Sequence, residues 1–167
     1  AQLIGDEDSA QKFFTKMLRS SDTEFLGLRG LVNQAIKKGD NHQALKWVRQ
    51  AYQLKPESDW VVRTKFELTC RAGLWREAYD ALALAVQKKQ VDPTEAKHSR
   101  AILNYQMSIE VKASGDDAKA LELSKKASNE KLEFVPAQVH LARLLKSCEK
   151  QKEATKILEA AWAHTAH

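Results

Sequence analysis

The side chains that could carry covalent or metal chemistry are few and scattered along this 167-residue chain. Cys70 and Cys148 belong to no C-x-x-C motif, and neither lies near a histidine pair with the spacing of a zinc site. No G-x-S-x-G or H-E-x-x-H motif occurs. The five histidines are His42, His98, His140, His164 and His167. We therefore expect two buried cysteines in a reducing compartment, no metal site and no enzyme activity.

The composition favours a helical protein with a protein partner. Only six glycines and three prolines interrupt the chain, and no run of about twenty apolar residues could form a transmembrane helix. The net charge of +5 is spread evenly, without a basic arm or stripe. This pattern is weak evidence for nucleic-acid binding and fits an acidic protein partner at least as well, so we expect no nucleic acid.

Small residues recur along the chain with a period of 34. Gly39, Ala44 and Ala51 are followed 34 positions later by Gly73, Ala78 and Ala85. The same spacing returns, after an eight-residue expansion, at Gly115, Ala120 and Ala127, and again at Glu149, Ala154 and Ala161. One period earlier it matches Gly5 and Ala10. A fixed period of this length is the signature of a repeat protein.

The positions of these residues predict a helix–turn–helix in each repeat. Glycine tolerates the left-handed backbone conformation that ends a helix. Asp40 and Asp116 directly follow a glycine and are suited to cap the next helix. The two alanines, seven residues apart, lie on one face of the second helix, where a small side chain lets a neighbouring helix come close.

This pattern resembles the tetratricopeptide repeat, with matches at Leu28, Leu31, Pro56, Val62 and Phe66. Further matches are Leu82, Leu141, Leu145 and Leu158. The resemblance implies an all-α, right-handed superhelical solenoid of about nine helices. We expect a single domain over 1–167, made of a partial repeat at 1–22 and repeats at 23–57, 58–92, 93–132 and 133–167, the third with an extended first helix.

Two irregularities accompany the repeat. Asp92, Pro93 and Glu95 predict the start of a helix that runs from about 93 to 114. The chain also begins in mid-repeat, with a second helix over about 6–19 that lacks its partner. The apolar residues of this helix are Ala10, Phe13, Phe14, Met17 and Leu18. We expect part of this face to be exposed, through Phe13, Phe14 and Met17, and to pair with a second copy in a fragment of a longer protein.

Five segments carry a closer resemblance. They are DTEFLGLRGL at 22–31, SDWVV at 58–62, RAGLWREA at 71–78, FVPA at 134–137 and ATKILEAAW at 154–162. In this order they resemble the C-terminal repeat region of the alphaproteobacterial HemY family, proteins associated with haem biosynthesis and porphyrin metabolism. The resemblance implies an upstream inner-membrane anchor, repeats on the cytoplasmic side and no catalytic residues. The composition is that of a soluble globular protein, so we expect this fragment itself to be soluble.

The repeat pattern places a partner-binding groove on the first helices. Its residues of most interest are Arg29, Asn33, Lys37, Trp60, Arg63, Arg71, Tyr105, Lys112, Arg143 and Lys146. The same pattern positions include Leu26, Glu67, Ile102, Ile109 and Val139. Mixed arginine, lysine and aromatic side chains are typical of protein-interaction hot spots. Solvated charges on helix faces would give the same pattern.

Two functions from different classes fit these observations. The first is a non-enzymatic interaction scaffold without a cofactor, whose partner is a protein or peptide, for example a haem-pathway enzyme. The second is a carrier of haem or a porphyrin, whose axial ligand would come from His98, His140, Cys70 or Cys148. We expect Trp47, Trp75 and Trp162 to be packing residues, whereas Trp60 falls on a groove position.

Overall fold

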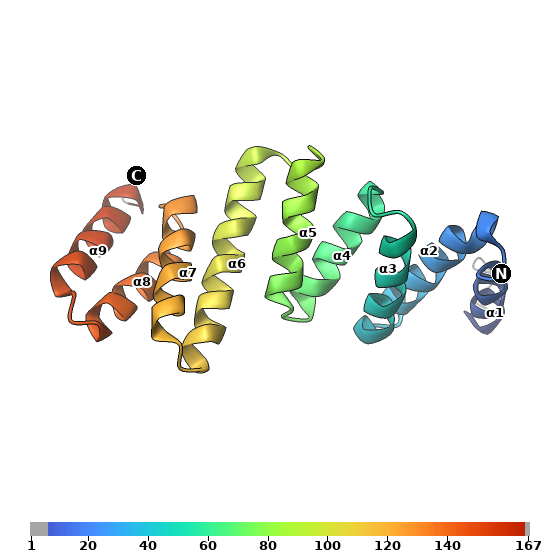
Figure 1. Ribbon diagram of the computed structural model, residues 1–167, viewed down its shortest axis with the longest axis horizontal. Helices are drawn as coiled ribbons and strands as arrows, with labels where there is room; N and C mark the ends of the chain where they lie inside the picture. The colour runs from blue at the N-terminus through green and yellow to red at the C-terminus, as the bar shows by residue number, and fades with distance from the viewer. Residues whose placement is uncertain (1–6, 166–167) are drawn as a thin grey trace. The chain divides into compact units, whose positions relative to one another are not determined.

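The structure, a computed structural model, describes residues 7–165, and every regular element in this range is an α-helix (Figure 1). The helices are α1 (Glu7–Met17), α2 (Ser21–Lys37), α3 (Asn41–Leu54), α4 (Asp59–Arg71), α5 (Trp75–Gln87), α6 (Pro93–Ala113), α7 (Asp117–Glu130), α8 (Val135–Ser147) and α9 (Gln151–Thr165). These nine helices confirm the predicted all-α fold class. Within this range, none of them is long and apolar enough to cross a membrane.

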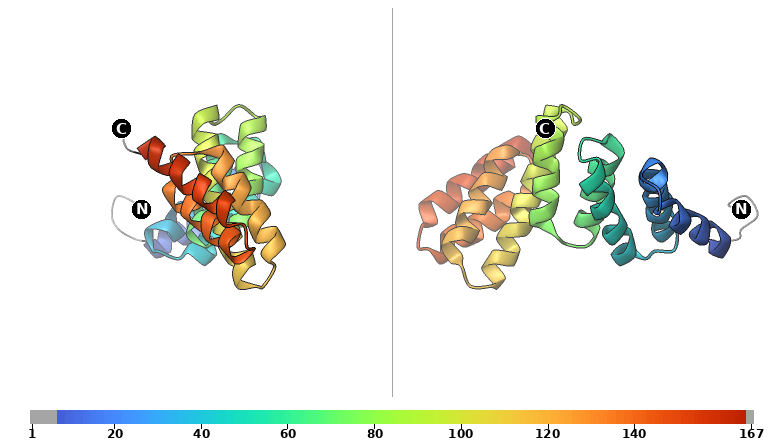
Figure 2. Two further views of the ribbon diagram at one scale, coloured as in Figure 1. Left: turned by 90° about the vertical axis from the view of Figure 1, so that its left-hand side faces the viewer. Right: turned by 45° about the vertical axis from the view of Figure 1, so that its right-hand side comes forward.

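The contacts divide the chain into two compact units, residues 1–90 and 91–167, and each is described by itself. In the first unit α1 packs on α2, α2 on α3, α3 on α4 and α4 on α5. In the second unit α6 packs on α7, α7 on α8 and α8 on α9, and α6 also contacts α8. Short turns connect the two helices of each pair (Figure 2). The repeat boundaries and the single continuous domain stay predictions.

The turns between paired helices have the left-handed backbone that the glycine period predicts. Gly39, Gly73 and Gly115 have φ values of 73°, 70° and 90°. Glu149 occupies the same position in the last repeat with a φ of 60°. A non-glycine residue rarely adopts this conformation, and Glu149 adopts it at the position that glycine holds in the other turns.

The predicted helix caps are present. The side chains of Asp40 and Asp116 each accept a hydrogen bond from the backbone N–H three residues later, at 3.0 Å. Asp92 accepts hydrogen bonds from the backbone N–H groups of Thr94 and Glu95, and Pro93 occupies the first turn of α6. These bonds satisfy N–H groups that have no partner inside the helix.

The periodic alanines are all buried, with exposed fractions between 0% and 7%. They are Ala10, Ala44, Ala51, Ala78, Ala85, Ala120, Ala127, Ala154 and Ala161. Larger side chains fill the space around them. In the first unit the core cluster includes Leu28, Val32 and Leu68, and in the second a cluster includes Leu141 and Leu145. The alanines therefore set how closely neighbouring helices approach.

Helix α1 packs on α2, as expected for one side of this helix, and two glycines of α2 make the contact, which the repeat pattern did not predict. A Cβ atom at Gly27 would lie 2.8 Å from the carbonyl oxygen of Phe14 and 2.9 Å from Cβ of Met17. A Cβ atom at Gly30 would lie 2.6 Å from Cγ of Phe14. Phe14 and Met17 are half-buried, so their expected exposure is wrong. The expected helix start at Asp6 and the turn at Gly5 lie outside the described residues.

Phe13 is the large apolar side chain of α1 that remains exposed, with 61% of its surface accessible. The expected dimer through this end therefore depends on Phe13 among the described residues of α1. We expect weak self-association, measurable by analytical ultracentrifugation at about 0.1–1 mM, and loss of it in Phe13→Glu. A wild-type chain that stays monomeric over this range would contradict the prediction.

A buried polar network joins α7 to α8. The hydroxyl of Ser128 donates a hydrogen bond to Oε1 of Gln138 at 2.7 Å. Nε2 of Gln138 donates back to the carbonyl oxygen of Ser128 at 3.2 Å and to that of Lys131 at 3.4 Å. Ser128 and Gln138 are each 2% exposed. Hydrogen bonds as well as apolar packing therefore stabilise the interface between α7 and α8.

Candidate functional site

Six of the predicted groove residues belong to the first unit, on the first helices of two repeats. Arg29, Asn33 and Lys37 lie on α2, and Trp60, Arg63 and Arg71 lie on α4. All are exposed except Trp60, which is half-buried. The structure therefore makes their polar ends available to a partner.

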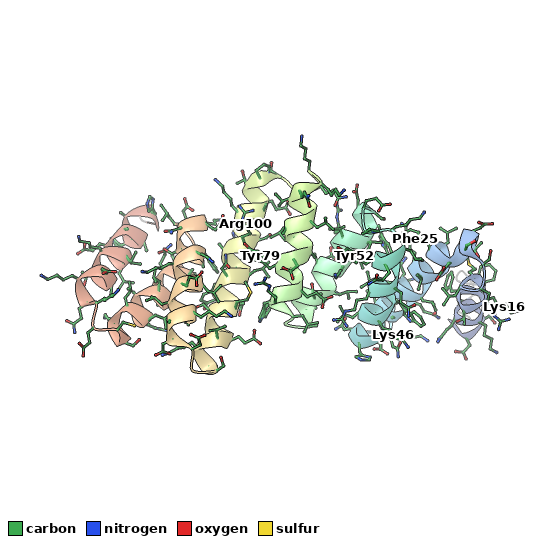
Figure 3. The ribbon with its side chains drawn as sticks, viewed as in Figure 1. Lys16, Phe25, Lys46, Tyr52, Tyr79 and Arg100 are labelled. Carbon is green, nitrogen blue, oxygen red and sulfur yellow. The ribbon has the colours of Figure 1, made fainter. Side chains whose placement is uncertain are left out.

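Aromatic rings and cations alternate across α2 and α4. Trp60 packs edge-on against Phe25, with ring centroids 5.9 Å apart, and Cζ of Arg29 lies 5.4 Å from the centroid of Trp60. Nζ of Lys55 lies 4.8 Å from the ring of Phe25, which Figure 3 labels. Trp60 also packs against the core cluster. It therefore contributes to the packing of the core and to the predicted groove surface. The contacts of Phe25 and Lys55 depend on the helix crossing, and the repeat pattern did not predict them.

The other predicted residues belong to the second unit, where several of them line one pocket. The cavity measures about 570 Å³ and lies between α6 and α8. From α6 it is lined by Tyr105, Ile109, Lys112 and Ala113, and from α8 by Val135, Pro136, Val139, His140 and Arg143. The predicted residues Tyr105, Lys112 and Arg143 are thus brought together. Lys146 is exposed further along α8 and does not line the cavity.

A hydrogen bond fixes the tautomer of His140 at this pocket. Oγ of Ser108 lies 2.6 Å from the carbonyl oxygen of Ala120 and 3.0 Å from Nε2 of His140. A hydroxyl has one proton, and the carbonyl can only accept. Ser108 therefore donates to Ala120, and Nε2–H of neutral His140 donates to Ser108. Nδ1 is left as the unprotonated ring nitrogen, with no hydrogen-bond partner among the described residues.

The surroundings of His140 favour its neutral form. Burial, and after it the charges of Arg143 and Lys112, lower the pKa of the imidazole. Tyr105 packs edge-on against the ring at 5.6 Å. The contact with Tyr105 and the hydrogen bond to Ser108 could not be found from the sequence alone. The sequence does show that His140 is three residues before Arg143, a spacing that places the two side chains on the same side of a helix.

The lowered pKa of His140 predicts a loss of stability in mild acid. Because the folded-state pKa lies below the unfolded value of about 6.5, the unfolded chain binds the proton more readily. Stability should fall as the pH decreases below about 6.5, until the folded-state pKa is passed. His140→Gln should weaken this dependence, measured by thermal unfolding between pH 7.5 and 5.5. An NMR titration of His140 with a midpoint above about 6.5 would contradict this prediction.

Neither Ser108 nor Cys70 is arranged as an activated nucleophile. Ser108 is fully buried and its proton is held by a backbone carbonyl, so it is not an accessible nucleophile. Burial, together with the charge of Glu67, raises the pKa of the Cys70 thiol and disfavours the reactive thiolate. Residues 7–165 contain no group of three or more metal-binding side chains.

The expected burial is wrong at both cysteines and at Trp162. Cys148 is exposed, and Cys70 is half-buried rather than buried. Trp162 is 76% exposed on α9, and Leu158 on the same helix is 36% exposed. Both α9 residues lie on the last described helix, where no following helix covers them within residues 7–165. Trp47 does pack against the core cluster, and Trp75 is half-buried.

The paired helices, left-handed turns and buried alanines define a tetratricopeptide-like repeat protein. No family model and no curated protein matches the chain. Among solved structures, the crystal structure of MamA is 20% identical with a TM-score of 0.54, covering 97% of this chain and 90% of that chain. YrrB, described as a TPR protein with an unusual peptide-binding site, is 16% identical with a TM-score of 0.56. That match covers 97% of this chain and 79% of YrrB.

At 20% and 16% sequence identity, these similarities show the fold of the chain but not its function. Both MamA and YrrB are tetratricopeptide-repeat proteins, which agrees with the all-helical repeat fold. They do not support the assignment to the HemY family.

Proposed function

We propose that the chain is a non-enzymatic scaffold that binds a protein or peptide partner through the first helices of its repeats. The observation that carries this proposal is the pocket between α6 and α8, which combines apolar side chains with Lys112 and Arg143. The exposed cations around Trp60 in the first unit support it. YrrB, whose fold is similar, has a peptide-binding site by its description.

The cellular setting of this scaffold is a second part of the proposal, and it depends on the sequence resemblance alone. We propose that the chain follows an inner-membrane anchor in a longer protein, with its repeats on the cytoplasmic side. Its partners would then include enzymes of haem biosynthesis. The five segments that resemble the HemY family support this setting.

Charge reversal on the first helices tests the binding function. Arg63 is exposed and has no ion-pair partner in the part of the chain that the structure describes, so Arg63→Glu should leave the fold intact. Arg29→Glu would also break the contact with Trp60. Arg76→Glu on α5 is the matched control, because among the described residues Arg76 has only an exposed ion pair, with Asp80. The measurement is cross-linking and pull-down from cells expressing each variant.

We expect the double variant Arg29→Glu/Arg63→Glu to lose partners that the wild type and Arg76→Glu retain. Identification of a haem-pathway enzyme among those partners would support the proposed setting. Identical partner sets for all variants would contradict the role of these helices in binding.

We propose that the scaffold acts without haem. Nε2 of His140 is engaged by Ser108, and Nδ1 of His98 lies 3.0 Å from Nζ of Lys131. One nitrogen of each imidazole is thus engaged inside the protein, and we expect neither ring to ligate haem. Titration with hemin should therefore give no saturable Soret shift. A stoichiometric shift that disappears in His140→Ala or His98→Ala would overturn this prediction and favour the haem carrier.

A further inference from the structure

The pocket between α6 and α8 offers an apolar surface beside a positive charge. Tyr105, Ile109 and Val139 contribute apolar surface, and Ile109 is 39% exposed. The Tyr105 ring is held between Phe134, at 5.5 Å, and His140, at 5.6 Å, each packed edge-on. A cavity of about 570 Å³ falls within the usual size of a ligand-binding site. An aliphatic or aromatic side chain fits this surface.

The charges at the pocket are not balanced by acids on its lining. Nζ of Lys112 pairs with Asp117 at 2.7 Å, which offsets that charge. Arg143 is exposed on α8 and has no partner among the described residues. The lowered pKa of His140 favours its neutral form, which adds no positive charge. The guanidinium of Arg143 is therefore the free cation of the pocket, and its planar donors suit a carboxylate.

His140 supplies the third recognition element. Because Nε2–H donates to Ser108, the ring is fixed and its Nδ1 can act only as an acceptor while the ring is neutral. A peptide bond supplies the matching N–H donor. Apolar side chain, carboxylate and backbone N–H occur together in a peptide.

We propose that this pocket binds an acidic peptide segment, with an apolar side chain against Tyr105, Ile109 and Val139 and a neighbouring carboxylate paired with Arg143. A backbone N–H of the peptide donates to Nδ1 of His140. This assignment rests on the proposed scaffold function and names the class of its partner.

Three synthetic peptides test separately the carboxylates and the apolar side chains of the proposed ligand. The first is acetyl-Gly-Asp-Leu-Phe-Glu-Gly-amide. The second replaces Asp and Glu by Asn and Gln, and the third replaces Leu and Phe by alanine. Each is added to the 167-residue chain up to about 1 mM, where weak millimolar binding is detectable. The readouts are NMR signals from the His140 and Tyr105 rings, with the Trp60 indole as a reporter in the other unit.

We expect the first peptide to shift the His140 and Tyr105 signals, and the other two to bind at least about tenfold more weakly. Arg143→Glu and Arg143→Ala should each weaken the first peptide by about tenfold. Lys125→Glu on α7, an exposed position outside the pocket, is the matched control and should change binding less than about twofold.

Three results would overturn the assignment. They are equal binding of the amide-substituted peptide, unchanged binding by both Arg143 variants, and an absence of His140 and Tyr105 shifts at the highest concentration. If instead the peptide shifts Trp60 alone, the pocket assignment is wrong while the scaffold function stands. Circular dichroism of each variant checks that the helices are retained.

Discussion

Replacing Ala78 with leucine should lower the free energy of unfolding by about 1–3 kcal/mol. Ala78 lies on α5, its exposed fraction is 0%, and α5 packs directly on α4. The added side chain has no space unless the two helices move apart, because protein interiors are close-packed. Thermal and urea unfolding of the 167-residue chain provide the measurement.

Ala83→Leu is the matched control for this prediction. It makes the same chemical change on the same helix at an exposed position, where a leucine meets solvent. We expect its stability to remain within about 0.5 kcal/mol of the wild type. Equal stability of Ala78→Leu and Ala83→Leu would show that the alanine period does not mark close helix contacts.

Replacing Gly27 with alanine should open the contact between α1 and α2. In an unconstrained helix this change would add about 1 kcal/mol of stability through helix propensity. Here the new Cβ would lie 2.8 Å from the carbonyl oxygen of Phe14, which belongs to the backbone of α1 and cannot rotate away. The helix must shift, and the packing of Phe14 and Met17 on α2 is lost with it.

We expect hydrogen exchange of the α1 amides to become at least about tenfold faster in Gly27→Ala. The amides of α4 and α5 should keep their protection. Asn33→Ala is the control, because it changes an exposed residue of the same helix. Slower exchange of α1 in Gly27→Ala would mean that helix propensity outweighs the clash.

The sequence predicted the repeat because a few positions depend on local chemistry alone. Gly39 and Gly115 adopt positive φ, Asp40 and Asp116 cap the following helices, and Ala78 is buried. Each requirement follows from backbone conformation or from the closeness of two helices within one repeat. A period of 34 residues makes such requirements visible in a single sequence.

The details of the candidate site depend instead on how separate helices cross. Ser108 faces His140 because α6, α7 and α8 meet there, and its partner Ala120 belongs to α7. Phe14 is half-buried because α2 presents Gly30 to it. The period places Trp162 on a second helix, but its exposure depends on whether another helix covers it. No spacing in the sequence specifies these contacts between elements.

The hydrogen bonds between Ser128 and Gln138 restrict how α8 can align against α7. Repeats with similar glycines and alanines present similar faces to one another, so a helix could settle against the wrong neighbour or slip by one turn. Apolar contacts tolerate such a slip, but a buried amide does not, because each unsatisfied polar group costs about 1–3 kcal/mol. Gln138 finds its acceptors only when α8 meets α7 in one alignment. A misaligned packing of α8 on α7 would therefore leave the amide of Gln138 without these partners and would be less stable than the observed one.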